Sequence, residues 1–243
     1  ASCERGPPMR RIFRGLVLIG ALGALGGSGC ADNDSSMFVR AVLKLESGEC
    51  VAKPDPSSTF FSAGVVDLAF RDSYSASLLV GNQLVRRGSK ELVRTETSRI
   101  VMRGAEVRLL NDQQQLLREF TVPVSGFIDP GTGDEPGYGV TSALLIPSGL
   151  ALSAGTRIVA DVRIFGDTLG GEEITSDSLS FPITVCDGCL ISYPSDADDP
   201  AQPGYQCIAG GDNASTDAPC RMGQDEAVDC RLCGNLSICV SPP

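Results

Sequence analysis

Two C-x-x-C pairs near the C-terminus are the residues best suited to carry chemistry. The first spans Cys186 to Cys189 and the second spans Cys230 to Cys233. Together they have the spacing of a four-thiolate zinc site, and either one alone could be a redox-active dithiol. A redox dithiol needs a thiolate that is stabilised by nearby cations or a helix N-terminus, and Asp187 has the wrong charge for that role. In an oxidising compartment such thiols form disulfides instead, so the choice depends on where the chain is delivered.

The N-terminal residues predict export. A basic segment from Met9 to Arg14 precedes an apolar run from Leu16 to Leu25, and small residues follow from Gly26 to Gly29. This order is typical of a signal peptide. The apolar run is shorter than the ~20 residues that a membrane-spanning helix needs. We therefore expect residues 1–29 to comprise upstream residues and a signal peptide that begins at Met9 and is removed.

The cysteine that follows these small residues resembles the lipobox of bacterial lipoproteins. The family has Leu three positions before the cysteine, where this chain has Gly27. The resemblance implies that Cys30 is acylated, that residues 30–36 form a lipidated cysteine and a flexible tether, and that the anchor is the chain's link to the membrane. Ala31 directly after the cysteine implies sorting to the outer membrane. The alternative is an ordinary signal peptide with Cys30 as a disulfide partner.

The number of cysteines fits a set of disulfides. The chain has ten, and removal of Cys3 with the leader and of Cys30 by acylation leaves eight. Cys50 lies far from the other seven, so an even set requires it to pair with the C-terminal tail. Eight cysteines permit 105 connectivities, and the sequence does not choose among them. The disulfide candidates are Cys50, Cys186, Cys189, Cys207, Cys220, Cys230, Cys233 and Cys239.

The C-terminal tail, residues 186–243, differs in composition from the rest. It contains seven cysteines and nine acidic residues against two arginines in 58 residues. A segment of this kind has little apolar material for a core, so we expect cross-links to stabilise it. Its acidic loops could supply oxygen ligands to calcium, although the register of an EF-hand is missing, and solvated acidic loops are the alternative. The calcium candidates are Asp196, Asp198, Asp199, Asp212 and Asp217.

The absence of histidine narrows the catalytic chemistry. It removes the usual general base and the commonest metal ligand, so Ser-His-Asp and Cys-His catalysis are excluded. Paired carboxylates, as in glycosidases, remain open. Their spacing does not distinguish a catalytic pair from solvated turns, and we expect neither an enzyme nor a cofactor. The carboxylates considered are Asp134, Glu135, Asp161, Glu172 and Glu173.

The net charge argues against nucleic acid as a partner. Of 20 basic and 30 acidic residues, four and one lie before Cys30, which leaves a net charge of −13 on the chain from Cys30 onward. Binding to phosphates needs clustered Lys and Arg, and the chain has no such cluster. Anionic head groups would also repel this chain, so attraction by charge is not how it would reach a membrane.

Residues 37–185 predict a β-sandwich domain. Apolar and polar residues alternate from Val39 to Leu45, from Val66 to Phe70 and around Val107, as in half-buried antiparallel strands. Turn residues separate these segments, and no helical window is convincing, although Arg86 to Glu96 could be a loop or a short helix. The fold class expected is all-β, an antiparallel sandwich with a disulfide-rich irregular tail. Further strands are expected at 74–80, 116–124, 138–146, 157–165 and 179–185.

Two segments of this domain resemble immunoglobulin-like and fibronectin III modules of bacterial surface proteins. Residues 104–126 are similar to the strand C to C′ hairpin, and residues 149–186 are similar to the F to G hairpin. The Cys, Trp, Cys core of an immunoglobulin domain proper is missing, because the chain has no Trp. The resemblance implies a sandwich fold and a role in display or interaction.

These patterns favour a non-catalytic envelope lipoprotein with a structural or protein-interaction role. It would be anchored in the membrane through the lipid on Cys30, and another envelope protein is its candidate partner. The alternative is a small-ligand or calcium-dependent binding module that uses the acidic loops.

Overall fold

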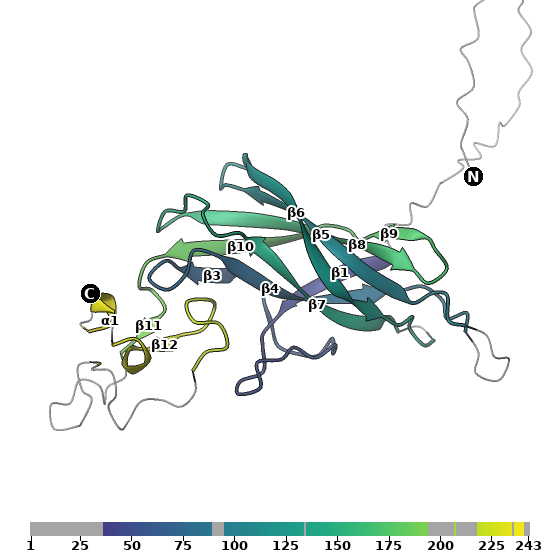
Figure 1. The fold of residues 1–243 in the computed structure, drawn as a ribbon, viewed down its shortest axis with the longest axis horizontal. Coiled ribbons are helices and arrows are strands. Elements are labelled where there is room, and N and C mark those ends of the chain that lie inside the picture. Colours follow the sequence, from purple (N-terminus) through teal and green to yellow (C-terminus); the bar gives the residue numbers. More distant parts are fainter. Residues whose placement is uncertain are drawn as a thin grey trace, which may run out of the picture. The chain divides into compact units, whose positions relative to one another are not determined.

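The computed structural model describes residues 36–88, 95–133, 135–193, 207, 218–234 and 236–240 (Figure 1). Cys30, Asp134 and the five calcium candidates lie outside this part of the chain. Most of the described strands belong to two β-sheets.

The first sheet has four strands in the order β2-β1-β4-β7. All its neighbours are antiparallel. Three of its strands were expected from the alternation of apolar residues, whereas the two-residue β2 is too short to give a pattern. The strands are β1 (Met37–Leu43), β2 (Phe60–Phe61), β4 (Tyr74–Asn82) and β7 (Gly137–Ile146).

The second sheet has six strands, five of which follow the order β3-β10-β8-β5-β6, while β9 pairs with β8. The two segments that resemble hairpins contain antiparallel pairs, β5 with β6 and β8 with β10. β3 runs parallel to β10 and forms the edge of the sheet. The strands are β3 (Gly64–Asp67), β5 (Ile100–Leu110), β6 (Leu116–Ile128), β8 (Arg157–Thr168), β9 (Glu173–Thr175) and β10 (Leu179–Cys186).

One hydrophobic core joins the two sheets. Leu78 and Leu145 of the first sheet belong to the same buried cluster as Val107, Val162 and Ile183 of the second. Burial alternates strictly along most of β8, as expected for a strand with one face on the core. The expected fold class, an all-β sandwich with a disulfide-rich tail, is confirmed.

Two strands depart from the expected alternation. In β1 the pairing register shifts between Val39 and Ala41, so that Val42 as well as Leu43 is buried. Such a bulge moves later side chains to the other face, which a strict two-residue period cannot anticipate. The strand expected from Val66 to Phe70 ends at Asp67, because its carbonyl accepts hydrogen bonds from the amides of Phe70 and Arg71 and thereby forms a turn.

Four disulfides hold the tail, and one of them joins it to the sandwich. Short elements run between them: β11 (Ile191–Ser192) pairs in parallel with β12 (Val228–Asp229), a 3₁₀ turn covers Cys230–Leu232, and α1 spans Ser237–Val240. Of the described helices, neither is long and apolar enough to cross a membrane. The disulfide pairs are Cys50–Cys220, Cys186–Cys189, Cys207–Cys230 and Cys233–Cys239.

The sandwich has two ends that differ in what they carry. At the tether end, Met37, Asn82 and Gly137 are cross-strand neighbours, and the Gln83 amide donates to the Ser36 carbonyl at 2.9 Å. At the tail end lie the last residues of β3 and β10, Asp67 and Cys186, which are paired. The tail packs at this second end, where α1, β11 and β12 appear in Figure 1.

Candidate functional site

A polar cluster at the tail end fixes the tail to the sandwich. The Tyr74 side chain opens β4 and is fully buried, and its hydroxyl donates to Asp225 Oδ2 at 2.7 Å. Asp225 Oδ1 accepts a second hydrogen bond from the Val65 amide at 2.8 Å, while the Asp225 amide donates to the Val65 carbonyl at 3.1 Å. One tail carboxylate therefore links a strand of each sheet.

Gln224 extends this cluster along β4. Its amide side chain is 2% exposed and bonds both polar groups of the Ser75 backbone, accepting from the amide at 3.1 Å and donating to the carbonyl at 2.8 Å. Gln224 also forms a bridge with Val66, and the Asp67 amide donates to the Gly223 carbonyl at 2.9 Å. Residues 223–225 thus lie between β3 and β4 and complete their backbone hydrogen bonds.

Two arginines lie at this cluster. Arg221 donates to the Ser75 carbonyl and, at 3.0 Å, to the Ser77 hydroxyl. Burial lowers the pKa of Arg221, and the nearby charge of Arg71 lowers it further. Arg71 Nε is buried without a hydrogen-bond partner among the described residues.

Burial controls the ionisation of the cluster. It raises the pKa of Tyr74, and the neighbouring Asp225 carboxylate raises that pKa further, so the hydroxyl stays a donor. Burial also raises the pKa of Asp225, although the hydrogen bonds from Val65, Tyr74 and Gln224 act in the opposite direction. The carboxylate is held by donors on three sides, which is an arrangement for joining segments rather than for exchanging protons with a substrate.

Glycines admit the close approaches that the cluster requires. A Cβ on Gly64 would lie 2.5 Å from the Tyr74 hydroxyl oxygen, so a side chain there would displace the ring. Gly223 has a φ of +76°, and a Cβ on it would lie 2.4 Å from Phe70 Cβ. Both positions need glycine for the tail to pack against the sandwich.

Asp67 organises the first C-x-x-C pair. It is fully buried at the end of β3, and its carboxylate accepts from the amides of Ala69, Gly188 and Leu190 at 2.6 to 3.0 Å. A ligand atom of Asp67 lies within 4.8 Å of the sulfurs of Cys186 and Cys189, and the three residues form a group able to hold a metal ion. The two sulfurs are joined in a disulfide, which leaves them no thiolate to offer a metal.

The second C-x-x-C pair does not close on itself. Cys230 pairs with Cys207 and Cys233 pairs with Cys239, so the four C-x-x-C cysteines occupy three separate disulfides. Asp229 accepts from the Arg231 amide at 2.9 Å and forms an ion pair with its guanidinium at 2.6 Å. The hydrogen bond from Arg231 lowers the pKa of Asp229, which favours the ionised pair within this turn.

A cleft of about 590 Å³ lies beside the disulfide that joins the tail to the sandwich. Lys44 and Glu226 line it and form an ion pair at 3.1 Å. A second cleft at the tail end, of about 350 Å³, is lined by Leu117 of β6 and by Leu150 and Leu152 of the β7–β8 loop. Both clefts are open to solvent on the part of the molecule farthest along the strands from Ser36.

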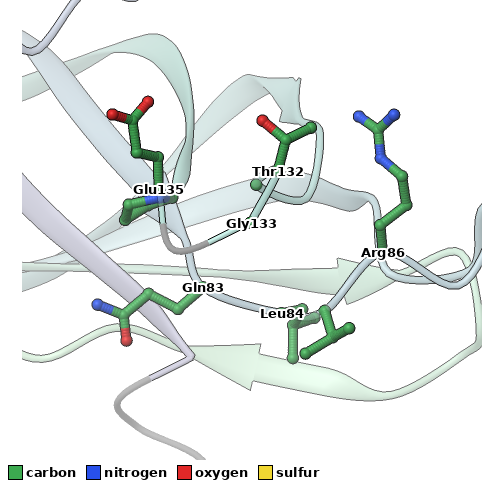
Figure 2. A pocket seen from close by; sticks show the side chains of 9 residues that line it. Gln83, Leu84, Arg86, Thr132, Gly133 and Glu135 are labelled. Carbon is green, nitrogen blue, oxygen red and sulfur yellow. The ribbon is translucent and has the colours of Figure 1, made fainter.

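A pocket of about 550 Å³ lies at the tether end (Figure 2). Gln83, Leu84 and Arg86 come from the segment after β4, and Figure 2 shows Thr132 and Glu135 on the facing β6–β7 loop. The bridge between Thr132 and Glu135 makes this loop a tight turn.

Hydrogen bonds to backbone groups fix the walls of this pocket. Asn82 Nδ2 donates to the carbonyls of Ser98 at 2.9 Å and Ile128 at 3.2 Å, which ties three strand ends together. The Glu96 carboxylate accepts from the amides of Arg87, Gly88 and Ser98. These three hydrogen bonds lower the pKa of Glu96 against the opposing effect of desolvation, which is the largest single influence on it.

The carboxylates considered for catalysis lie on different elements. Glu135 lines the tether-end pocket, whereas Asp161 lies on β8 and accepts from the Ser180 hydroxyl on β10. Glu172 precedes β9 and Glu173 begins it, and both are exposed. Asp161, Arg108 and Glu119 line a charged pocket of about 420 Å³ on the outer face of the second sheet.

The residues that hold the tail were not singled out from the sequence. Asp225 lies in an acidic segment whose other members look the same, and Tyr74 was assigned only to a strand. The partners of this pair are 151 residues apart, so no local pattern connects them. The one available indication was a tyrosine shortly before the apolar residues Leu78 to Val80 of the same expected strand, because a buried hydroxyl needs a partner.

No protein-family model matches the chain, and no curated protein shows significant similarity to it.

Proposed function

We propose that the chain is a lipid-anchored, non-catalytic lipoprotein of the bacterial cell envelope that presents its tail end to another envelope protein. Cys30 carries the lipid, residues 31–36 are the tether, and the sandwich is the stalk. The outer membrane is the proposed location, on the resemblance of the residues around Cys30 to a lipobox that is followed by Ala31.

The arrangement of the two ends is the observation that carries this proposal. The chain enters the sandwich at Ser36, and the tail packs at the opposite end, beyond the starts of β6 and β8. The 12 residues of β8 run between the ends. At about 3.3 Å per residue they hold the tail roughly 36 Å from the tether end. The tail of an anchored chain therefore lies at the end of the sandwich that is farther from the tether.

The cysteines support export. The four disulfides use eight of the ten cysteines, and the other two are Cys3 and Cys30, which precede the described residues. Disulfides of this density are typical of domains that mature in oxidising compartments. Cys3 belongs to the expected leader, so Cys30 is the one mature cysteine that the four pairs do not use.

The tail end has surfaces suited to a protein partner. Two clefts open there, and apolar side chains are exposed around them. Interfaces are enriched in apolar and aromatic side chains at their centres. The strand orders of both sheets are compatible with the resemblance to immunoglobulin-like and fibronectin III modules. The exposed apolar residues at this end are Val51, Phe60, Leu116, Leu117 and Met222.

Fractionation of cells that express a Cys30→Ala variant tests the anchor. The wild-type chain should sediment with membranes and the variant should be released, because the variant lacks the acylated sulfur. Cys3→Ala is the matched control and should sediment as the wild-type chain does. Retention of Cys30→Ala in the membrane fraction would contradict the proposal.

Intact mass of the purified mature chain, with and without alkylation, tests the rest. We expect an N-terminus at Cys30, the added mass of acyl chains, and no alkylated thiol unless the protein is first reduced. A mature chain that retains its leader, or that has eight reactive thiols, would rule out the exported and cross-linked form.

A further inference from the structure

Three strongly exposed apolar side chains gather at the tether end. Val85 is 79% exposed, Phe127 is 58% exposed and Leu169 is 50% exposed. All three lie beside one segment, Thr97 to Arg99. The Ser98 hydroxyl donates to the Val85 carbonyl, and the Leu169 amide donates to the Arg99 carbonyl. The Arg99 guanidinium lies 4.8 Å from the centre of the Phe127 ring. These three side chains come from the segment after β4, from the end of β6 and from the turn after β8, and they define the tether-end face.

The tether begins at the same place. Ser36 accepts a hydrogen bond from Gln83, two residues before Val85, so the chain leaves the sandwich beside this face. Six residues, Ala31 to Ser36, separate Cys30 from the sandwich. Even fully extended, a segment of six residues spans at most about 22 Å. A lipid on Cys30 would therefore hold the tether-end face within reach of the bilayer surface.

Among the described residues, the charges near the face largely compensate one another. Asp129 pairs with Arg99 at 2.6 Å, and Asp167 pairs with Arg103 at 2.9 Å. Glu96 is occupied by three backbone amides. Arg86 and Arg87 directly follow Val85, and the acidic residues Glu135, Glu172 and Glu173 lie on or beside the neighbouring loops. Contact with a membrane at this end would depend on apolar side chains and would respond little to salt.

We propose that the tether-end face rests on the lipid bilayer, with Val85, Phe127 and Leu169 inserted among the lipid head groups. This inference rests on the proposed function, because the acylated Cys30 supplies the proximity. It adds an orientation: the strands stand away from the membrane and the tail end points outward. Apolar and aromatic side chains favour the head-group region, and a surface already held there by a lipid gains from each one it buries.

The chain allows a direct test, because it contains no tryptophan. Single variants Val85→Trp, Phe127→Trp and Leu169→Trp each place one fluorophore on the face. Leu117→Trp is the matched control, since Leu117 is 46% exposed at the opposite end. The mature acylated proteins are reconstituted into phosphatidylethanolamine and phosphatidylglycerol vesicles, with and without brominated acyl chains that quench nearby tryptophan.

We expect the emission of the three face variants to shift to shorter wavelength on vesicle binding and to be quenched by brominated lipid, with neither effect for Leu117→Trp. High salt should leave this difference intact. A chain that is acylated and vesicle-bound but shows no quenching at any of the three positions overturns the orientation alone. Equal quenching at Leu117 overturns it too. A mature chain without acyl groups that does not bind vesicles overturns the proposed function and this inference together.

Discussion

Tyr74 and Asp225 meet through a 2.7 Å hydrogen bond although 151 residues separate them. The tyrosine is fully buried, and the carboxylate belongs to the tail. Removal of the hydroxyl in Tyr74→Phe deprives a half-buried carboxylate of a donor, and we expect the free energy of unfolding to fall by about 2 kcal/mol. Tyr138→Phe is the control, because the one hydrogen bond of the Tyr138 hydroxyl within the described part of the chain is an exposed contact with Arg40 at 3.3 Å. Urea unfolding of both variants measures the difference. Equal losses of unfolding free energy would contradict a stabilising role for the Tyr74 hydroxyl.

The buried carboxylate should make stability depend on pH in a defined direction. Burial raises the pKa of Asp225 in the folded chain. The unfolded value is about 4. The stability that the raised pKa of Asp225 contributes is therefore fully present below the unfolded pKa. It is lost as the pH rises through the folded pKa. Asp225→Asn does not titrate, so the wild-type chain should gain stability relative to this variant as the pH falls towards 4. Urea unfolding of both proteins over a series of pH values measures this, and a gap that is constant or shrinks would contradict it.

Two glycines allow the cost of backbone strain to be measured apart from the cost of a steric clash. Gly149 has a φ of +77° with open space around it, and Gly223 has a φ of +76° but faces Phe70. Gly149→Ala should cost about 1 kcal/mol for the left-handed conformation. Gly223→Ala should cost about 1 to 3 kcal/mol more, because Phe70 must move. Thermal unfolding of the two variants gives the comparison. Indistinguishable losses would mean that the tail segment does not pack against Phe70.

The disulfides should differ in their effect on stability. Cys50 and Cys220 are 170 residues apart, whereas Cys233 and Cys239 are six residues apart. If loop closure in the unfolded chain dominates, loss of the long link in Cys50→Ala/Cys220→Ala costs about 5 kcal/mol and loss of the short one about 2 kcal/mol. Denaturant unfolding of the two double variants checks the order, and a larger loss for the short loop would reverse it.

Calcium should leave the folded chain unchanged. The acidic loops lack the register of an EF-hand, and the carboxylates Asp67 and Asp225 are engaged by backbone amides. The thermal midpoint in millimolar calcium should therefore match that in a chelator, with magnesium as the control cation. A clear rise specific to calcium would favour the calcium-dependent binding module, since a ligand that binds the folded state stabilises it.

The fold class could be predicted because it depends on local patterns. Alternation along segments such as Arg157–Phe165 predicts a half-buried strand, and the observed strand β8 contains that segment. Short strands such as β2 and β9 were not predicted, because two or three residues are too few to show an alternation. The bulge in β1 was not predicted, because one extra residue moves each later side chain of the strand to the opposite face.

The candidate site could be predicted only in part. An even set of eight cysteines required Cys50 to pair with the tail, and it does. The number of cysteines alone could not select Cys220 from the available partners. The roles of Asp67 and Asp225 depend on which backbone amides surround them after folding. From the sequence, an isolated acidic residue is expected to be solvated, because its neighbours do not indicate which distant amides will donate hydrogen bonds to it.

The 170-residue span between Cys50 and Cys220 also constrains the order of events during biosynthesis. Chains grow at about 5 to 20 residues per second, so a chain exported during its synthesis delivers Cys50 to the oxidising compartment roughly 10 to 30 s before Cys220. The first later cysteine to be made is Cys186, and it precedes its own partner by only three residues. Rapid closure of that small ring removes the earliest competitor for the waiting thiol. The cysteine spacing thus favours formation of the correct long link.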